Sequence, residues 1–106
     1  MGQILENPAG LADLVDYQDN SIVSKIITKK DAGNVTIFAI DRGQSLSTHS
    51  APYDAFVSII DGQAQITVGD KFFVLDKGQG VIMPADIPHA VKAENKFKML
   101  LVMIKS

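Results

Sequence analysis

The 106-residue chain contains no cysteine and no tryptophan, and it has only two histidines. Without cysteine the chain can form no disulfide, no thiolate nucleophile and no thiolate metal site. His49 and His89 are therefore its only side chains that are both strong metal ligands and general bases near neutral pH. Ten basic and twelve acidic residues give a formal net charge of −2. The chain therefore lacks the strongly basic composition that is typical of domains that bind nucleic acids or anionic membranes.

Targeting and membrane-spanning patterns are also missing from the sequence. Residues 1–20 lack the basic start and apolar core of a secretory signal. The longest apolar run, Met99 to Ile104, is far shorter than the roughly 20 residues of a membrane-spanning helix. Glycine-rich phosphate loops and the nucleophile elbow of hydrolases are absent as well. We therefore expect a soluble, cytoplasmic chain whose partners include neither nucleic acid nor membrane.

What the chain does contain is a series of short β-prone runs separated by turn residues. Its length and a hydrophobic fraction of 46% suit one globular domain. Alternation of apolar and polar residues is clearest at 63–68, which predicts a strand with one buried face. About nine strands are expected, a pattern typical of an all-β sandwich or barrel. Besides the run that leads to His49, they lie at 21–28, 35–40, 55–60, 63–68, 72–75, 80–83, 88–93 and 97–104.

Two local signals set expectations for the path of the chain. The dipeptide Asp61-Gly62 predicts a tight hairpin between the strands at 55–60 and 63–68, because glycine adopts positive φ without steric cost. Residues 8–17 carry apolar side chains at helical spacing but include Gly10, so a short helix and a loop are alternatives there. We expect residues 1–20 to form an N-terminal segment and residues 21–106 to form a single barrel.

The strand predicted at 97–104 is apolar on both faces from Met99 onward. A strand in a sheet with one solvated face alternates, so this strand is expected to be covered on both sides. Its cover is either the chain's own N-terminal segment or a second copy. The first twenty residues carry acidic side chains and the last sixteen carry four lysines, which favours packing of the two ends within or between chains. We predict a homodimer in which residues 1–20 contact the partner.

The first histidine lies in a segment that resembles the first motif of the cupin family. Gly43 is followed after five residues by His49, and Gly62 stands at the glycine that closes the motif. Ala51 occupies the place of the family's second histidine, and Ala55 the place of its glutamate. The segment HSAPYDA also resembles a subgroup of small stand-alone cupins, in which these alanines belong to the pattern.

The second histidine lies in a segment that resembles the second cupin motif. Gly78, Pro84 and His89 match it in order and spacing, with Asp86 in place of a glycine and Ala93 in place of the closing asparagine. Together the two motifs, with the expected strands around them, imply a double-stranded β-helix, or jelly roll. The resemblance also implies a pocket at one mouth of that barrel.

The resemblance and the alternation of strand residues together predict the walls of this pocket. Alternate residues of a strand share a face, so an inward His49 and an inward His89 bring their alternate neighbours with them. Pro52 and Tyr53 lie between strands. They form either a lid over the pocket or a plain surface loop. The predicted pocket residues are His49, Ala51, Tyr53, Ala55, Val57, His89 and Val91.

The resemblance implies a metal site that is incomplete in this chain. Catalytic metal sites usually use three protein ligands, and only His49 and His89 remain of the family's set. The candidates for a third ligand are Tyr53, Asp54, Asp61 and Met99. We interpret the methionines at strand positions as core side chains, namely Met83, Met99 and Met103. We expect either weak binding of a divalent ion (Zn, Fe, Mn or Ni) or two histidines that orient a ligand without metal.

Two functions agree with these residues. One is a non-catalytic cupin that binds a small molecule in the pocket around the two histidines. The other is an enzyme, such as an oxygenase, isomerase or decarboxylase, that acts on a small acid or sugar through a metal or through histidine acid–base chemistry. The missing family ligands weigh against a metal-dependent oxygenase, so binding is the favoured interpretation.

Overall fold

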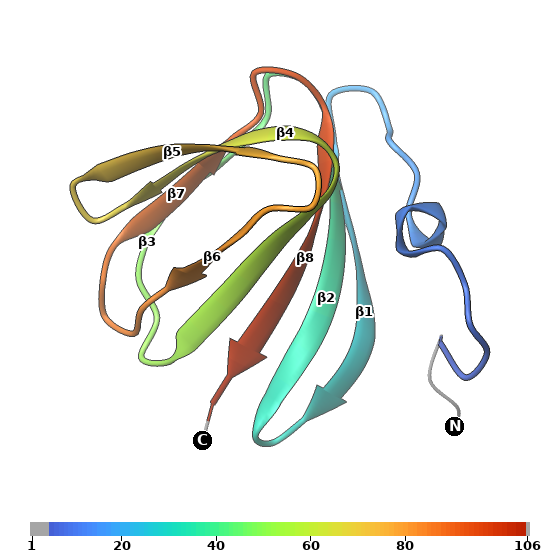
Figure 1. Ribbon diagram of the computed structural model, residues 1–106, viewed down its shortest axis with the longest axis horizontal. Coiled ribbons are helices and arrows are strands. Elements are labelled where there is room, and N and C mark those ends of the chain that lie inside the picture. The colour runs from blue at the N-terminus through green and yellow to red at the C-terminus, as the bar shows by residue number, and fades with distance from the viewer. Residues whose placement is uncertain (1–4, 106) are drawn as a thin grey trace.

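The computed structural model describes residues 5–105 (Figure 1), so the first four residues of the expected N-terminal segment and the last residue of the expected barrel lie outside it. One short 3-10 helix, η1 (Leu11–Leu14), precedes the strands. The strands are β1 (Ile22–Lys30), β2 (Gly33–Ile40), β3 (Ser45–His49), β4 (Asp54–Val68), β5 (Lys71–Asp76), β6 (Gly80–Met83), β7 (His89–Lys92) and β8 (Phe97–Ile104).

The strands form two antiparallel sheets that share β4. The first half of β4 pairs with β8 and β6, and β8 continues through β2 to β1. The second half of β4 pairs with β5 and β7, and β7 continues to β3. The sheets curl toward each other around a common interior, with β3, β5 and β7 on one side and β1, β2 and β8 on the other (Figure 1). This architecture confirms the predicted all-β double-stranded β-helix.

The predicted hairpin at Asp61-Gly62 is wrong, because β4 runs through both residues without reversing. A shift in the β4–β8 register between Ile59 and Asp61 marks a β-bulge, and Gly62 has a φ of 76°. A Cβ on Gly62 would lie 2.5 Å from the carbonyl oxygen of Lys96, so no other residue fits this close approach. Glycine therefore bends one long strand from the first sheet into the second. Two predicted strands fuse, and the described residues contain eight strands.

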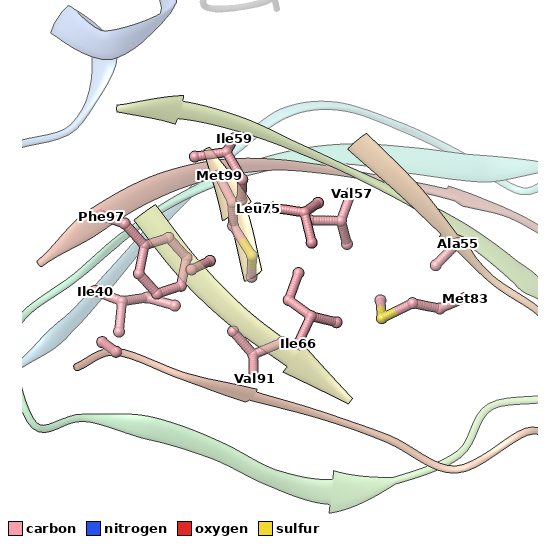
Figure 2. Packing of buried hydrophobic residues seen from close by; sticks show 12 residues of the cluster. Ile40, Ala55, Val57, Ile59, Ile66, Leu75, Met83, Val91, Phe97 and Met99 are labelled. Carbon is pink, nitrogen blue, oxygen red and sulfur yellow. The ribbon is translucent and has the colours of Figure 1, made fainter. Parts of the chain in front are cut away.

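The main core lies between the two sheets (Figure 2). Phe97 and Ile40 lie at one end of this cluster and Ala55 and Met83 at the other. Phe97 and Ile40 are fully buried, and they are register partners across β2 and β8. The remaining buried members of the cluster are Val57, Ile59, Ala64, Ile66, Leu75, Val91, Ala93 and Met99. Phe97 and Ile40 thus close one end of the barrel, whereas Ala55 stands with Met83 at the other.

A second apolar cluster joins the N-terminal segment to the outer face of β1, β2 and β8. Val15 is buried there with Ile37 and Ala39, and Leu100 of β8 packs against them. The expected helix over 8–17 is a single turn, η1, between extended stretches. The N-terminal segment therefore covers the outer face of β8 at Leu100. Ile104, the last residue of the same strand, is 52% exposed.

Polar contacts hold the same N-terminal segment at the bend of β4. The hydroxyl of Tyr17 donates a hydrogen bond to Oδ2 of Asp61 at 2.7 Å. Burial, and then the hydrogen bond and charge of Asp61, raise the pKa of the Tyr17 hydroxyl above its ordinary value. The largely buried Lys98 donates from Nζ to the carbonyl oxygen of Ala12 and lies over the Tyr17 ring. Within residues 5–105, no helical stretch has the length and hydropathy that a bilayer crossing requires.

Candidate functional site

Strand pairing brings the two histidines together at the open end of the barrel. His49 is the last residue of β3, His89 is the first residue of β7, and the two are register partners. Their Nε2 atoms lie 3.0 Å apart, and the rings meet edge to face with centroids 4.3 Å apart. Residues forty positions apart in the sequence therefore form one polar unit.

Each histidine ring has a backbone carbonyl oxygen beside its Nδ1 atom. Nδ1 of His49 lies 2.8 Å from the carbonyl oxygen of Ser47, and Nδ1 of His89 lies 3.3 Å from that of Ile87. The two Nε2 atoms lie within hydrogen-bond distance of each other, at 3.0 Å. A hydrogen on one Nε2 makes that ring the donor and the other ring the acceptor, so the tautomers of the two rings are coupled.

The two rings differ in their surroundings. His89 is 6% exposed, whereas His49 is exposed at the mouth of the barrel. Burial, followed by the charge of the neighbouring His49, lowers the pKa of His89 below its ordinary value. Near neutral pH the neutral form of His89 is therefore favoured, which is the form that ligates metals and acts as a base.

A cavity of about 380 Å³ opens beside the histidine pair. Of the predicted pocket residues, six line it, namely His49, Ala51, Tyr53, Ala55, His89 and Val91. Val57 does not line the cavity; it lies deeper, fully buried in the core. The other lining residues are Phe38, Leu46, Ser50, Met83, Met99, Leu101 and Met103. The walls are thus mostly apolar, and the polar groups gather at the mouth.

Sequence reasoning missed the role of two methionines in this wall. Ala55 pairs with Met83 of β6 on one side and with Met103 of β8 on the other, so the three residues form one row across adjacent strands. Both methionines line the cavity and pack on the core. Strand periodicity alone cannot place them beside Ala55, because the pairing of β6 and β8 with β4 is not visible in the sequence.

The carboxylates considered as third ligands are engaged elsewhere. Oδ1 of Asp54 accepts a hydrogen bond from the backbone N–H of Ala85, and Asp61 accepts one from Tyr17 on the outside of the barrel. Within residues 5–105, no three side chains of the types His, Cys, Asp and Glu are grouped so that they could hold a metal ion. Tyr53 lines the cavity, and its ring lies under Nζ of Lys105. The histidine pair therefore lacks an acidic companion in this part of the chain.

Several solved structures resemble most of the chain. A conserved protein of unknown function from Streptococcus pyogenes is 35% identical, with 95% of this chain and 89% of that chain covered and a TM-score of 0.90. A cupin 2 conserved barrel domain protein from Leptotrichia buccalis is 44% identical over 89% of this chain and 46% of that chain, with a TM-score of 0.86. A cupin superfamily protein from Desulfitobacterium hafniense is 28% identical over 95% of this chain and 93% of that chain, with a TM-score of 0.90.

A search of the curated proteins found no match. The family model described as cupin domain matches residues 36–105, which runs from within β2 through β8 and includes both histidines. The matched segment is well over half of the sequence, and the curled double sheet and the cupin structures above agree with it. The chain therefore belongs to the cupin family.

Proposed function

We propose that this cupin is a binding protein whose barrel cavity, around His49 and His89, takes a small molecule with an apolar body and one polar group. The proposal rests on how apolar and polar side chains are distributed over the cavity wall. Apolar side chains line the interior of the cavity of about 380 Å³, and the histidine pair stands at its mouth. An apolar pocket with a few convergent polar groups is the usual form of a small-molecule site. A sugar, which needs hydrogen-bond partners all round, fits such walls less well than a compact acid.

The donor set does not fit the divalent metal sites expected for Zn, Fe, Mn or Ni. The two imidazoles supply two of the three protein ligands that catalytic sites usually use, and no carboxylate or third histidine joins them within residues 5–105. We therefore propose weak binding of such divalent ions at most.

Benzoate and its neutral analogue benzamide are suitable probes for the binding proposal. Two-dimensional NMR of the labelled chain should show benzoate shifting the methyl signals of Leu46, Val91 and Leu101, with a weaker response to benzamide. The double change His49→Ala and His89→Ala should reduce benzoate affinity at least tenfold. Thr48→Ala is the matched control, because Thr48 precedes His49 on β3 but is not among the residues that line the cavity. Equal benzoate affinity in the double variant and the control contradicts the proposal.

A second candidate function is acid–base catalysis by the histidine pair. Its support is the lowered pKa of the buried His89, which keeps a neutral base beside the cavity. Exchange of the methylene protons of phenylpyruvate for deuterium tests this candidate directly. If the protein exchanges these protons faster than buffer alone, and His89→Ala removes the difference, the result favours an enzyme. If the exchange rate with the protein equals that of buffer alone, the acid–base role is rejected.

We also propose that the chain works as a cytoplasmic homodimer. The outer face of the first sheet has an apolar row beyond the N-terminal segment, in which Val102 pairs with Phe56 and Phe56 pairs with Ile82. Phe56 is 37% exposed and Ile82 is 51% exposed, so this row is free to meet the same row of a second copy. Light scattering at micromolar concentration should give twice the chain mass. A single-chain mass removes the homodimer from the proposal.

A further inference from the structure

The outer face of the second sheet carries a groove that the histidine pair does not border. Ile66 of β4 and Val91 of β7 are buried in the core, and successive residues of a strand point to opposite faces. Their neighbours Thr67 and Ala90 therefore point away from the core, on the side of the molecule where β3, β5 and β7 lie (Figure 1). A groove of about 340 Å³ crosses these strands. Only Leu46 and Val91 border both this groove and the barrel cavity.

Strand register places an aromatic ring at one side of the groove and a low floor beside it. Phe72 of β5 is the register partner of Thr67 of β4, and Thr67 is the partner of Ala90 of β7. Phe72 is 60% exposed, so its ring is open to a ligand. The small side chain of Ala90 leaves the surface hollowed at β7. Three strand spacings separate β5 from β3, so the groove extends about 14 Å across the sheet.

The opposite side of the groove carries hydroxyl groups, because β3 is bulged there. The β3–β7 register shifts between Leu46 and His49, so β3 has two residues where β7 has only Ala90. These two residues are Ser47 and Thr48, which are exposed and border the groove. The neighbouring row across the sheet adds three more polar side chains, namely Ser45, Lys92 and Gln65.

The polar side chains of this groove are balanced in charge and partly fixed in position. Nε2 of Gln65 donates a hydrogen bond to Oε2 of Glu94. This bond holds the amide in place and uses its nitrogen, so the amide oxygen serves as an acceptor at lower entropic cost. Lys92, which lines the groove, and Glu94 carry opposite charges. The groove therefore favours a neutral ligand over an ionic one.

The outer face of the first sheet shows what is distinctive about this groove. There the exposed ring of Phe56 lies in a row with Val102 and Ile82, and this row is wholly apolar. In the second sheet the exposed ring of Phe72 stands beside hydroxyl groups instead. A matching ligand needs a flat apolar face and a rim of hydroxyls. A sugar ring with equatorial hydroxyls has both, and its C–H groups are attracted to the negative face of an aromatic ring.

We propose that the outer groove of the second sheet is a second binding site, which takes a neutral β-linked saccharide. One sugar ring packs on Phe72, and its hydroxyl groups bond to Thr67 and to the bulge of β3. The site is independent of the barrel cavity and goes beyond the proposed function. The width of the groove, across four strands, accommodates two linked sugar rings.

The test is a titration of the labelled full chain with cellobiose, followed by two-dimensional NMR. The methyl signals of Thr48, Thr67 and Ala90 should shift, whereas those of Leu101 in the barrel cavity should stay in place. Glycerol at the same hydroxyl concentration is the control ligand, because it carries hydroxyls without a ring, and it should leave all of these signals in place. Equal shifts with glycerol and cellobiose contradict the proposal.

Variants separate packing on the ring from general hydrophobicity. Phe72→Leu should weaken cellobiose binding at least about fivefold, because it keeps an apolar side chain and removes the ring, whereas Phe72→Tyr should change it less than about twofold. Thr67→Val keeps the shape, removes the hydroxyl and should weaken binding about threefold or more. Val74→Ala is the matched control, because Val74 is 47% exposed on the same face of β5 but does not line the groove. It should change binding less than about twofold.

Thermal unfolding of every variant separates lost binding from lost folding. The proposal is overturned if cellobiose shifts no signal in the groove, or if folded Phe72→Leu protein binds cellobiose as the wild type does. It is also overturned if the groove signals shift with protein concentration in the absence of sugar, because the groove then holds a second copy of the chain. Phe72→Leu should leave benzoate affinity unchanged, and the double histidine variant should still bind cellobiose. Failure of one proposal is thus distinguished from failure of the other.

Discussion

The two ends of the barrel are built from the same strands but are filled differently. At the end where β8 begins, Phe97 pairs with Ile40 and both are fully buried. At the end where β8 finishes, Ala55 stands between two methionines, and a cavity opens beside the histidine pair. The cavity thus lies at the end where an alanine, and not a large side chain, stands between the neighbouring strands β6 and β8. Packing at the closed end provides much of the stability, which leaves the open end free for chemistry.

The largest expected effect comes from emptying the closed end. Phe97→Ala should lower the free energy of unfolding by about 3–5 kcal/mol, because it removes a fully buried aromatic ring and leaves a cavity. Urea unfolding followed by circular dichroism measures the loss. Phe97→Leu, which keeps much of the volume, should cost clearly less. A loss below about 1 kcal/mol for Phe97→Ala would mean that this end is not the tightly packed one.

The same enlargement at two alanines of β4 sharpens the comparison. Ala64→Leu should destabilise the chain by about 1–3 kcal/mol, because Ala64 is fully buried in the filled core. Ala55→Leu should cost less than about 1 kcal/mol, because its side chain enters the existing cavity. Ala55→Leu should nevertheless abolish the NMR response to benzoate. Equal destabilisation by the two changes would show that the cavity is not available space.

A smaller effect is expected where the N-terminal segment meets the outside of the barrel. Tyr17→Phe removes the hydrogen bond to Asp61 and should lower the free energy of unfolding by about 1 kcal/mol. Amide hydrogen exchange around Val15 should become faster in this variant. Tyr53→Phe makes the same chemical change at the mouth and should alter stability by less than about 0.5 kcal/mol. A larger loss of unfolding free energy for Tyr53→Phe than for Tyr17→Phe would show that the tyrosine at the mouth, and not Tyr17, contributes more to stability.

The smallest effect on stability is expected at the exposed histidine of the open end. His49→Ala should change the free energy of unfolding by less than about 0.5 kcal/mol, because the ring is exposed and its neighbours are not closely packed. The same variant should bind benzoate more weakly than the unchanged chain does. Binding lost with stability retained is the expected signature of a site residue, whereas a cost above about 2 kcal/mol would identify His49 as a structural residue.

Local patterns in the sequence predicted much of the fold, and non-local contacts account for what they missed. Alternation and turn residues located nearly every strand, since a half-buried strand must alternate. The hairpin at Asp61-Gly62 was predicted wrongly because the positive φ of Gly62 serves a bulge there. The neighbouring β8, through Lys96 and Phe97, determines the close approach, and residues 63–68 alone do not reveal it.

The candidate site shows the same division between local and non-local information. Motif spacing placed His49 and His89 on separate strands, and the structure puts their Nε2 atoms 3.0 Å apart. The row of Met83, Ala55 and Met103 depends on how β6 and β8 register on β4, which no local pattern reveals. The methionines were therefore interpreted only as core side chains, although both also line the cavity.

The bend in β4 also bears on how the molecule comes apart. Because β4 continues from one sheet into the other and hydrogen-bonds with β5, β6, β7 and β8, neither sheet can detach without disrupting that strand. Partial opening is then confined to the strands that pair with a single neighbour, namely β1, β3, β5 and β6. The rest of the barrel should unfold in one cooperative step, with the backbone amides at the centre of β4 the last to exchange with solvent.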